Sequence, residues 1–595
     1  MKNKKIISVF LSIVTVFVCL PFTVSAESFS DDAEYVEGEI IISSKKDVED
    51  TLRLLHTASD ENTVGIDFED VGIENIEEIE IYSEEENVYL AEVDGNIEKV
   101  CRELNENDDI IAEPNYILHT ADFTMPTEVS QRRGLYPSYQ EWYFNNILHI
   151  PEAWQENEVT GNGVTIAIID DGYNITAQDF PTNLWRNSNG TVGWNTYNDS
   201  DNISPIFKRD GTAFDNTLHG SNVAGVIGMT PNGSGGIGAA YGATLMLLQA
   251  ANYVNESTRP SFTSAAIVSA VDMARENGAD IINLSLGTTS NVSAISSAIT
   301  RAYNAGILVI AAAGNAGSPT SSQKFYPASL SNVIGVMAID KTDPSQLSDF
   351  SNYDTTGQGT YYDIAAPGVG ILGCNATDTN YSLSSGTSQA SPLVAAAAAL
   401  YMEKYPERTI QELKSDMLAS ATELVSSYSS TAYHYKSLNA QKLLDYCAPP
   451  QIIINLDTHA TLDGDYLYGL DEGYTDISDY ITVASGTGTA VFTPTQNGTG
   501  TGSTVEIYSK DGRLFKTITV IIFGDVNGDS FADGQDAVLI GCITDDSSDF
   551  STVQSYSADV DFDGLVTADN DNETADDRQI VSEYAIGDNI ISQLR

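Results

Sequence analysis

Val164-Thr165-Ile166-Ala167-Ile168-Ile169 is an almost unbroken apolar run, and Asp170-Asp171-Gly172 follows it directly. A strand that is covered on both faces in a parallel sheet has this character, because neither face alternates with polar residues. Ile307-Leu308-Val309-Ile310-Ala311 is a second such run, and Ala265 to Glu276 between the two has a helical pattern. Strands that alternate with helices predict an α/β fold with a doubly wound, mainly parallel sheet.

Asp170 stands where the first predicted strand ends. Functional sites of doubly wound sheets lie at the carboxyl ends of the strands, so this carboxylate is placed to hold another side chain. Neighbouring residues of an extended chain face opposite ways, and we expect Asp171 to point elsewhere. An acid at a strand end is usually structural, so the interpretation depends on its partners.

Two later segments supply such partners. His219 opens Leu218-His219-Gly220-Ser221-Asn222-Val223-Ala224-Gly225, before a helix of small residues. Ser388 lies in Ser385-Gly386-Thr387-Ser388-Gln389-Ala390-Ser391-Pro392, before an Ala-rich helix over 393–400. A serine hydroxyl is a weak nucleophile until an oriented imidazole takes its proton. Together the three segments predict a catalytic triad in which Asp170 orients His219 and His219 activates Ser388.

The chain order Asp, His, Ser and the string Gly386-Thr387-Ser388-Gln389-Ala390-Ser391-Pro392 resemble the subtilisin-like serine proteases, the subtilases of peptidase family S8. The resemblance implies a subtilisin-like fold over residues 122–448 and hydrolysis of peptide bonds in proteins or peptides without a catalytic cofactor. This chain departs from the family at two positions. Asn222 stands where a noncatalytic His is usual, and Gln389 stands where Met is common.

Two further segments resemble the subtilase substrate site. Asn315 lies in Ala311-Ala312-Ala313-Gly314-Asn315-Ala316-Gly317, and the resemblance implies that its amide donates to the oxyanion together with the Ser388 N–H. Ser285, Leu286 and Gly287 resemble the edge on which an extended substrate is added as a strand. Since no carboxylate lies near Ala316, we expect a broad or apolar preference for the residue before the scissile bond (P1).

The N-terminal residues indicate export. Residues 1–26 read as a secretory signal peptide, because lysines precede a long apolar stretch and Val24-Ser25-Ala26 offers small residues for cleavage. The predicted localisation is therefore secreted, extracellular or on the cell surface through a scaffold. The alternative is an uncleaved anchor. No later stretch is apolar enough to cross a membrane after signal cleavage.

Residues 27–121 alternate strand-like and helix-like patterns, such as the strand over 35–42 and the helix over 97–104. They resemble the subtilase propeptide of the inhibitor I9 type, a small α/β domain that acts as an intramolecular inhibitor. The resemblance places self-cleavage near Ala121 and implies a zymogen. The alternative is a separate N-terminal adaptor domain.

The last part of the chain changes character. Residues 449–522 carry short alternating strands and Gly/Thr-rich turns, which predict a small β domain or linker. Residues 523–595 contain two runs with the oxygen spacing of Ca²⁺-binding loops. The first run has oxygen donors at positions 1, 3, 5, 7, 9 and 12, namely Asp525, Asn527, Asp529, the carbonyl of Phe531, Asp533 and Asp536. Ser530 replaces its usual Gly.

The second run offers Asp559, Asp561 and Asp563, and Asp577 takes the last position if residues 570–576 are an insertion. Two such loops with helices resemble a type I dockerin, a helical calcium-loop module. The resemblance implies Ca²⁺ here and a cohesin module of a scaffoldin as partner, as in cellulosomes that degrade polysaccharides. The alternative is a stand-alone Ca²⁺-binding stabiliser. Structural Ca²⁺ in the catalytic domain stays an open question.

The net charge of −56 argues against nucleic acid and anionic membranes as partners, because both require basic patches. The cysteines have no close spacing, so neither a disulfide framework nor a zinc site is indicated, and a Cys374–Cys447 bridge stays open. The main interpretation is a serine endopeptidase that is secreted as a zymogen and attaches to a cohesin-bearing scaffold through its dockerin. Its rivals are a catalytically idle scaffold or adhesion component and a protease that processes assembly partners.

Overall fold

The computed structural model describes most of the chain between residues 34 and 536 and isolated residues beyond. The described residues are 34–44, 73–79, 87–93, 96–105, 110–120, 122–129, 138–206, 219–233, 235–253, 260–355, 359–375, 381–428, 431–448, 450–455, 458–471, 473–510, 512–533, 535–536, 539, 554 and 557–558. The proposed signal peptide and the second calcium run lie outside them.

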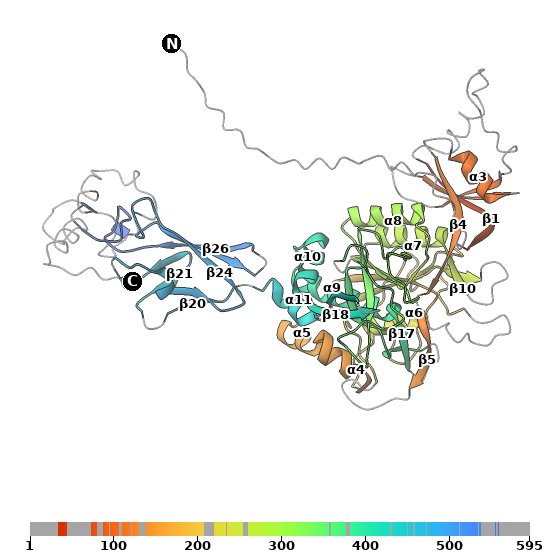
Figure 1. The fold of residues 1–595 in the computed structure, drawn as a ribbon, viewed down its shortest axis with the longest axis horizontal. Coiled ribbons are helices and arrows are strands. Elements are labelled where there is room, and N and C mark those ends of the chain that lie inside the picture. The colour runs from red at the N-terminus through yellow and green to blue at the C-terminus, as the bar shows by residue number, and fades with distance from the viewer. Residues whose placement is uncertain are drawn as a thin grey trace, which may run out of the picture.

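A sheet of nine strands forms the centre of the larger body (Figure 1). All its pairs are parallel except the outermost pair, β18 with β19. Its spatial order is β18 (Thr422–Tyr428), β19 (Thr431–Ser437), β15 (Ile364–Pro367), β14 (Val333–Ile339), β13 (Leu308–Ala312), β11 (Ile281–Leu284), β6 (Thr165–Asp170), β8 (Thr244–Gln249) and β7 (Trp194–Asn195).

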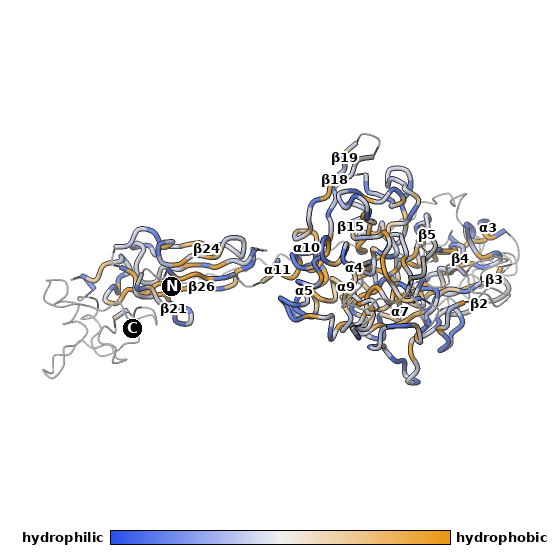
Figure 2. Tube along the Cα trace, turned by 90° about the horizontal axis from the view of Figure 1, so that it is seen from below, coloured by the Kyte–Doolittle hydropathy of each residue, from blue (hydrophilic) through white to orange (hydrophobic). Residues whose placement is uncertain are grey.

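Helices cover both faces of this sheet, as predicted. Alternate residues of β6 show the reason: Ile166 and Ile168 belong to one buried core, whereas Ala167 and Ile169 belong to another. The first core also holds α6 (His219–Gly228), α9 (Thr387–Lys404), α5 (Ile150–Asn157), α10 (Ile410–Ser420) and α11 (Ala440–Tyr446). The second holds α7 (Ser264–Glu276) and α8 (Ser293–Asn304). The orange interior segments of Figure 2 follow these buried strands and helices.

The N-terminal unit and the larger body share one sheet. Its strands are β2 (Ile73–Ile79), β3 (Asn87–Val93), β1 (Tyr35–Ser44), β4 (Ile110–Thr120), β10 (Pro260–Thr263) and β9 (Ala251–Tyr253), with β12 (Leu286–Gly287) also paired to β4. Helix α3 (Ile97–Leu104) packs on β1, β3 and β4 and buries Val100 and Leu104. The predicted strand over 35–42 and helix over 97–104 are both present.

A second small sheet lies beside the central one. It orders β16 (Ile371–Cys374), β17 (Tyr381–Gly386) and β5 (Asp122–Val129), all antiparallel. Helix α4 (Ser138–Tyr143) and the π-helical turn Phe144–Leu148 then lead into α5. The chain after β4 therefore returns to the larger body through β5.

Residues 450–523 form a separate β unit, at the blue end of Figure 1. A five-stranded sheet contains β21 (Thr461–Asp463), β22 (Tyr466–Tyr468), β26 (Leu514–Val520), β25 (Thr504–Ser509) and β24 (Gly488–Thr493), and β20 (Ile452–Ile454) pairs with β23 (Ile481–Val483). Val505, Ile507 and Ile518 are among its fully buried residues. This β unit has a hydrophobic core of its own.

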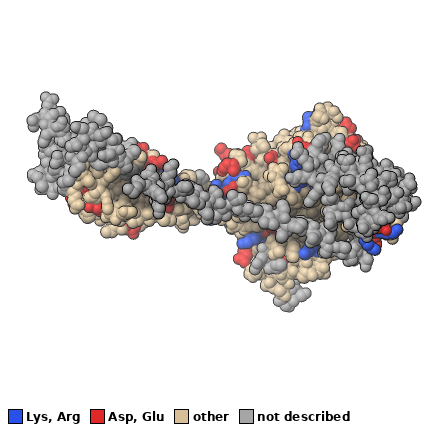
Figure 3. Space-filling view, turned by 90° about the horizontal axis from the view of Figure 1, so that it is seen from above, with Lys and Arg blue, Asp and Glu red and all other residues tan. Residues whose placement is uncertain are grey.

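Three buried cysteines, Cys101, Cys374 and Cys447, are free thiols, so the bridge considered between Cys374 and Cys447 is not formed. Within the described residues, none of the helices has the length and apolar character needed to span a bilayer. Figure 3 shows acidic side chains on both bodies and, among the described residues of that face, no large basic patch.

Candidate active site

Asp170 and His219 meet at the carboxyl end of β6. Asp170 is the last residue of the strand and His219 is the first residue of α6. The Asp170 Oδ1 atom lies 2.7 Å from His219 Nδ1, and both side chains are fully buried. A carboxylate only accepts hydrogen bonds, so Nδ1 carries the proton and Nε2 is the basic nitrogen of the imidazole. This is the tautomer that a general base for a serine requires.

Asp171 lies closer to Asp170 and His219 than the strand alternation predicted, but its hydrogen bond gives it a different task. Its Oδ1 accepts the backbone N–H of Gly220 at 2.9 Å and so fixes the first turn of α6. In the described part of the chain, one set of three His, Cys, Asp or Glu side chains has potential metal-ligand atoms within 4.8 Å of one another. Its members are Asp170, Asp171 and His219. The direct Asp170–His219 hydrogen bond fits proton chemistry at this cluster.

Ser388 lies in the first turn of α9, which starts at Thr387 and not after Pro392 as the apolar pattern suggested. Its hydroxyl donates to the carbonyl oxygen of Ser285 at 2.8 Å, and the Ser285 hydroxyl donates to the Ser388 carbonyl at 2.9 Å. These two hydrogen bonds join the predicted nucleophile to the predicted substrate edge. Ser388 is fully buried.

Asn315 is held by the residue before the nucleophile. Its Oδ1 accepts the backbone N–H of Thr387 at 2.9 Å and the Thr387 hydroxyl at 2.9 Å. The Thr387 Oγ1 in turn accepts the N–H of Gly314 at 3.0 Å. With the amide oxygen bound on this side, the Nδ2 group points the other way and is the donating end.

The two departures from the family pattern contact each other. Gln389 Nε2 donates to Asn222 Oδ1 at 3.3 Å, and Asn222 Nδ2 donates to Ser382 Oγ at 2.8 Å. Both amide side chains are essentially fully buried, between α6 and α9. A polar residue at 222 is therefore matched by a polar residue at 389, behind the nucleophile.

A subtilase family model matches residues 161–437, a span that contains the three predicted triad residues and Asn315. A thermophilic serine proteinase of Bacillus sp. (strain AK1) is 33% identical over 382 residues, which are 64% of this chain and 82% of that protein. This chain belongs to the subtilase family. Subtilisin DY of Bacillus licheniformis is 37% identical over 36% of this chain and 74% of its own, and thermitase of Thermoactinomyces vulgaris is 34% identical over 42% and 79%.

The protein is accordingly a serine endopeptidase, and its substrates are proteins or peptides. In this subtilase the predicted substrate edge is already paired with the chain's own N-terminal segment. Leu286 and Gly287 of β12 pair antiparallel with Thr120 and His119 of β4. On the other side, Phe262 of β10 pairs with Leu118. The end of β4 therefore lies as the middle strand between β10 and β12.

Beyond residue 120 the chain continues along a second edge. Asp122 of β5 pairs with Gly386 of β17, and Thr124 pairs with Ser385. Gly386 is two residues before Ser388 in the sequence. Thr120 therefore pairs with the predicted substrate edge and Asp122 with the residue two positions before the predicted nucleophile. Ala121 itself lies outside the described residues. Sequence reasoning found β12 but missed β10 and β17, because residues 260–263 and 381–384 are short segments without an unbroken apolar run, and the motif at 385–392 was interpreted only for its nucleophile.

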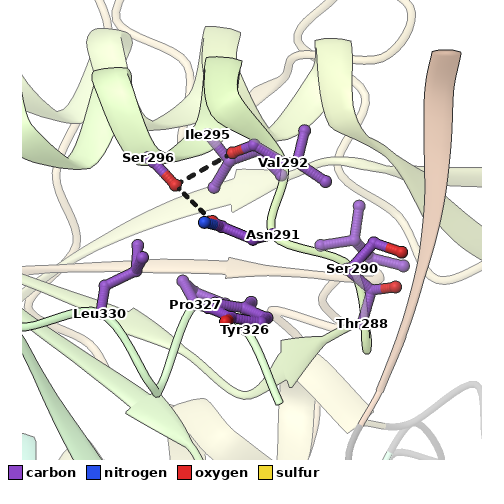
Figure 4. A pocket seen from close by; sticks show the side chains of 10 residues that line it. Thr288, Ser290, Asn291, Val292, Ile295, Ser296, Tyr326, Pro327 and Leu330 are labelled. Carbon is purple, nitrogen blue, oxygen red and sulfur yellow. Dashed lines mark hydrogen bonds between the residues drawn. The ribbon is translucent and has the colours of Figure 1, made fainter. Parts of the chain in front are cut away.

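Leu118 is one of the residues that line a small apolar pocket in this subtilase. Figure 4 shows the other side chains that line it. The pocket lies between the first turn of α8, where Ser296 donates to Asn291 and Val292, and the loop at Tyr326 and Pro327. Leu118 is 1% exposed, and the cavity that remains is about 10 Å³. That space is at most enough for a single water molecule.

The N-terminal unit also caps two helices of the subtilase domain. Glu113 accepts the backbone N–H groups of Ser293 and Ala294, at 3.0 and 2.7 Å, at the start of α8. Asn115 Oδ1 accepts from the hydroxyl of Ser264 and the N–H of Ala265, at 3.0 and 3.2 Å, at the start of α7. The N-cap residue of α8 itself, Val292, makes no side-chain hydrogen bond to these N–H groups. The unit therefore binds through the positive ends of both helices.

The first calcium run packs against the β unit. Asp525 Oδ2 accepts the N–H groups of Thr501 and Ser530, at 2.8 and 3.0 Å, and its Oδ1 accepts those of Gly528 and Asp529, at 2.8 and 3.1 Å. Asp536 Oδ1 accepts the N–H of Val526 at 2.8 Å and that of Asn527 at 2.9 Å. Both carboxylates are fully buried. Burial, together with the charge of Asp536, raises the pKa of Asp525 to about 6.

The donor chemistry of this run fits Ca²⁺, which prefers carboxylate, amide and carbonyl oxygens. Within the described residues its carboxylates do not form a group as close as Asp170, Asp171 and His219, and backbone N–H groups bind Asp525 and Asp536. Ser530 adopts a φ of +79°, the left-handed region that a Gly would favour. Asp559, Asp561, Asp563 and Asp577 of the second run lie outside the described residues.

Proposed function

We propose that this subtilase is made as a secreted zymogen in which the N-terminal unit inhibits the protease until the bond after residue 121 is cut. One observation carries this proposal: β4 passes from the N-terminal sheet into the substrate cleft, where Thr120 pairs with Leu286 and Asp122 pairs with Gly386. The helix caps made by Glu113 and Asn115 add to the support, because they hold the unit in place.

In the proposed mechanism Ser388 attacks the carbonyl of the substrate residue that lies beside Ser285 in the cleft. The Ser388 hydroxyl first turns from the Ser285 carbonyl toward His219, which takes its proton and later gives it to the leaving amine. Asp170 keeps the imidazole in the required tautomer and stabilises its charged form. The Asn315 amide and the Ser388 N–H donate to the oxyanion, and the chemistry uses only these side chains and backbone groups.

The test compares residues 27–595 with a Ser388→Ala variant of the same chain. We expect the wild type alone to release the N-terminal unit, to digest casein and to be labelled by a serine-directed phosphonate. A Ser221→Ala variant is the matched control: it removes a buried serine hydroxyl, which accepts the N–H of Asn174 at 2.9 Å, and leaves Ser388 unchanged. Release of the unit from the Ser388→Ala variant, or a full-length and inactive wild type, contradicts the proposal. The second result favours an idle scaffold.

We further propose that residues 523–595 bind Ca²⁺ and dock on a cohesin module. The spacing of the first run and its buried Asp525 and Asp536 support the calcium part. The expected result is capture of the Ser388→Ala protein by an immobilised type I cohesin in Ca²⁺, with release by chelator. Calcium binding without any capture would favour the alternative, a calcium-stabilised domain without a cohesin partner.

A further inference from the structure

The ring of Phe325 lies against two glycines of the active site. A Cβ atom built on Gly287 would lie 2.5 Å from Phe325 Cε1 and 3.0 Å from Cδ1. A Cβ atom built on Gly314 would lie 2.9 Å from Cγ and 3.0 Å from Cδ1 of the same ring. One edge of the ring therefore contacts both glycines, and only the missing side chains leave room for it.

These two glycines belong to the two segments that flank the scissile bond. Gly287 is in β12, the edge on which His119 and Thr120 lie. Gly314 precedes Asn315, the proposed oxyanion donor, whose side-chain oxygen is held by Thr387. A peptide that follows β12 and presents its carbonyl to Asn315 must direct its P1 side chain between these segments. The Phe325 ring closes that space.

Hydrogen bonds on both sides of Phe325 fix its backbone. Its N–H donates to the Tyr362 hydroxyl at 3.0 Å, and its carbonyl accepts the Ser329 hydroxyl at 2.9 Å. The next residue, Tyr326, exchanges two backbone hydrogen bonds with Thr288, the residue after β12, at 2.8 and 2.9 Å. The ring also packs against the core that contains α7 and α8. The Phe325 ring is therefore held in place and cannot easily move aside for a substrate side chain.

We propose that Phe325 restricts P1 to small residues, so that this subtilase cleaves after Gly, Ala or Ser and disfavours Phe and Leu. The inference rests on the proposed function, and it narrows the broad apolar preference expected from the sequence. The proposed cleavage site, the bond after residue 121, follows an alanine in the sequence, which agrees with a small P1 residue.

The test uses the mature enzyme and fluorogenic peptides that share Leu-His-Thr before a variable P1 residue, copying residues 118–120. We expect kcat/KM for P1 Ala to exceed that for P1 Leu and P1 Phe by about 10–200-fold, the range by which pocket fit discriminates side chains. Phe325→Gly should raise kcat/KM for P1 Phe and Leu toward the value for Ala. Phe325→Ala is a second variant with a smaller change of backbone freedom.

Phe515→Ala is the matched control, since that phenylalanine is 48% exposed on β26 of the separate β unit and should leave the P1 ratio unchanged. Wild-type cleavage after Phe or Leu as efficient as after Ala overturns the inference, and this measurement needs no variant. An unchanged ratio in both active Phe325 variants also overturns it. If no peptide is cleaved and a phosphonate leaves Ser388 unlabelled, the proposed function fails, and the inference fails with it.

Discussion

Both hydrogen-bond donors of Thr387 reach a single atom, the Oδ1 of Asn315, at 2.9 Å each. The residue before the nucleophile thus sets the direction of the amide that serves the oxyanion. Because the same threonine oxygen accepts the N–H of Gly314, the turn after β13 and the first turn of α9 are locked together. Position and orientation of the oxyanion donor are therefore parts of one network.

Changing this network should lower the turnover number more than it changes substrate binding. Asn315→Ala should reduce kcat by about 10²–10³-fold, the size that loss of one such donor has in a subtilisin. Thr387→Val removes the hydroxyl but keeps the backbone donor and the shape, so we expect a smaller loss of kcat. Steady-state kinetics on one peptide check both. If KM rose by a similar factor while kcat stayed constant, the result would contradict a role of this network in the transition state.

Glu113→Gln should weaken the grip of the N-terminal unit on the protease. The change removes the charge at the start of α8, where a carboxylate contributes about 1 kcal/mol, so inhibition by the released unit should weaken about fivefold. The measurement is the inhibition constant of residues 27–121 added to the mature enzyme. Glu37→Gln removes the same charge from an exposed site on β1 and should have no effect. If the Glu113→Gln and Glu37→Gln units inhibited equally well, the helix cap made by Glu113 would not contribute to inhibition.

Gln389 and Asn222 should depend on each other for stability. Gln389→Met leaves the buried Asn222 oxygen without this donor, which should lower the free energy of unfolding by about 1–3 kcal/mol. In a double-mutant cycle with Asn222→Ala, the cost of losing Gln389 should shrink, because the oxygen is then absent. Denaturant unfolding of Ser388→Ala protein, which avoids self-digestion, gives the values. Strictly additive effects would mean that the pair is not coupled.

Ser530→Gly should stabilise the C-terminal unit. A non-glycine residue in the left-handed region costs roughly 1–2 kcal/mol, and part of this gain is lost because glycine makes the unfolded chain more flexible. We expect a net rise of about 1 kcal/mol in the free energy of unfolding. Ser530→Ala keeps the strain and serves as the control. A destabilised Ser530→Gly protein in the thermal melt would contradict the backbone argument.

Without calcium, the C-terminal unit should become more stable as the pH falls. The folded pKa of Asp525, about 6, lies above its ordinary value of 3.8, so the folded state takes up the proton first. Stability then increases as the pH is lowered through about 6 and levels off below the ordinary value. With Ca²⁺ the pH dependence should reverse, so that stability falls as the pH is lowered, since the cation needs the ionised carboxylate. Thermal melts with chelator and with Ca²⁺ between pH 4 and 8 test this. Asp525→Asn should weaken both trends and leave the part that comes from Asp536, whose pKa is also raised by burial.

Much of the catalytic site was readable from the sequence because its residues sit in short motifs at element ends. Asp170 follows an apolar run, His219 and Ser388 open helices, and the structure brings Asp170 and His219 into contact at 2.7 Å. The edge at Ser285 to Gly287 was also named, and in the structure Leu286 and Gly287 pair with β4 of the same chain. The start of α9 was missed, since Thr387 and Ser388 are not apolar and the helical pattern begins only after them.

The sequence by itself determined the strand–helix alternation, the order of the triad residues and an alanine at position 121, because these depend on residue types and their spacing along the chain. Only the tertiary structure decided which strands flank the cleft, that Gln389 compensates for Asn222, and that Phe325 lies between Gly287 and Gly314. These contacts join residues far apart in sequence. Close packing of the folded chain selects them, and no local pattern encodes them.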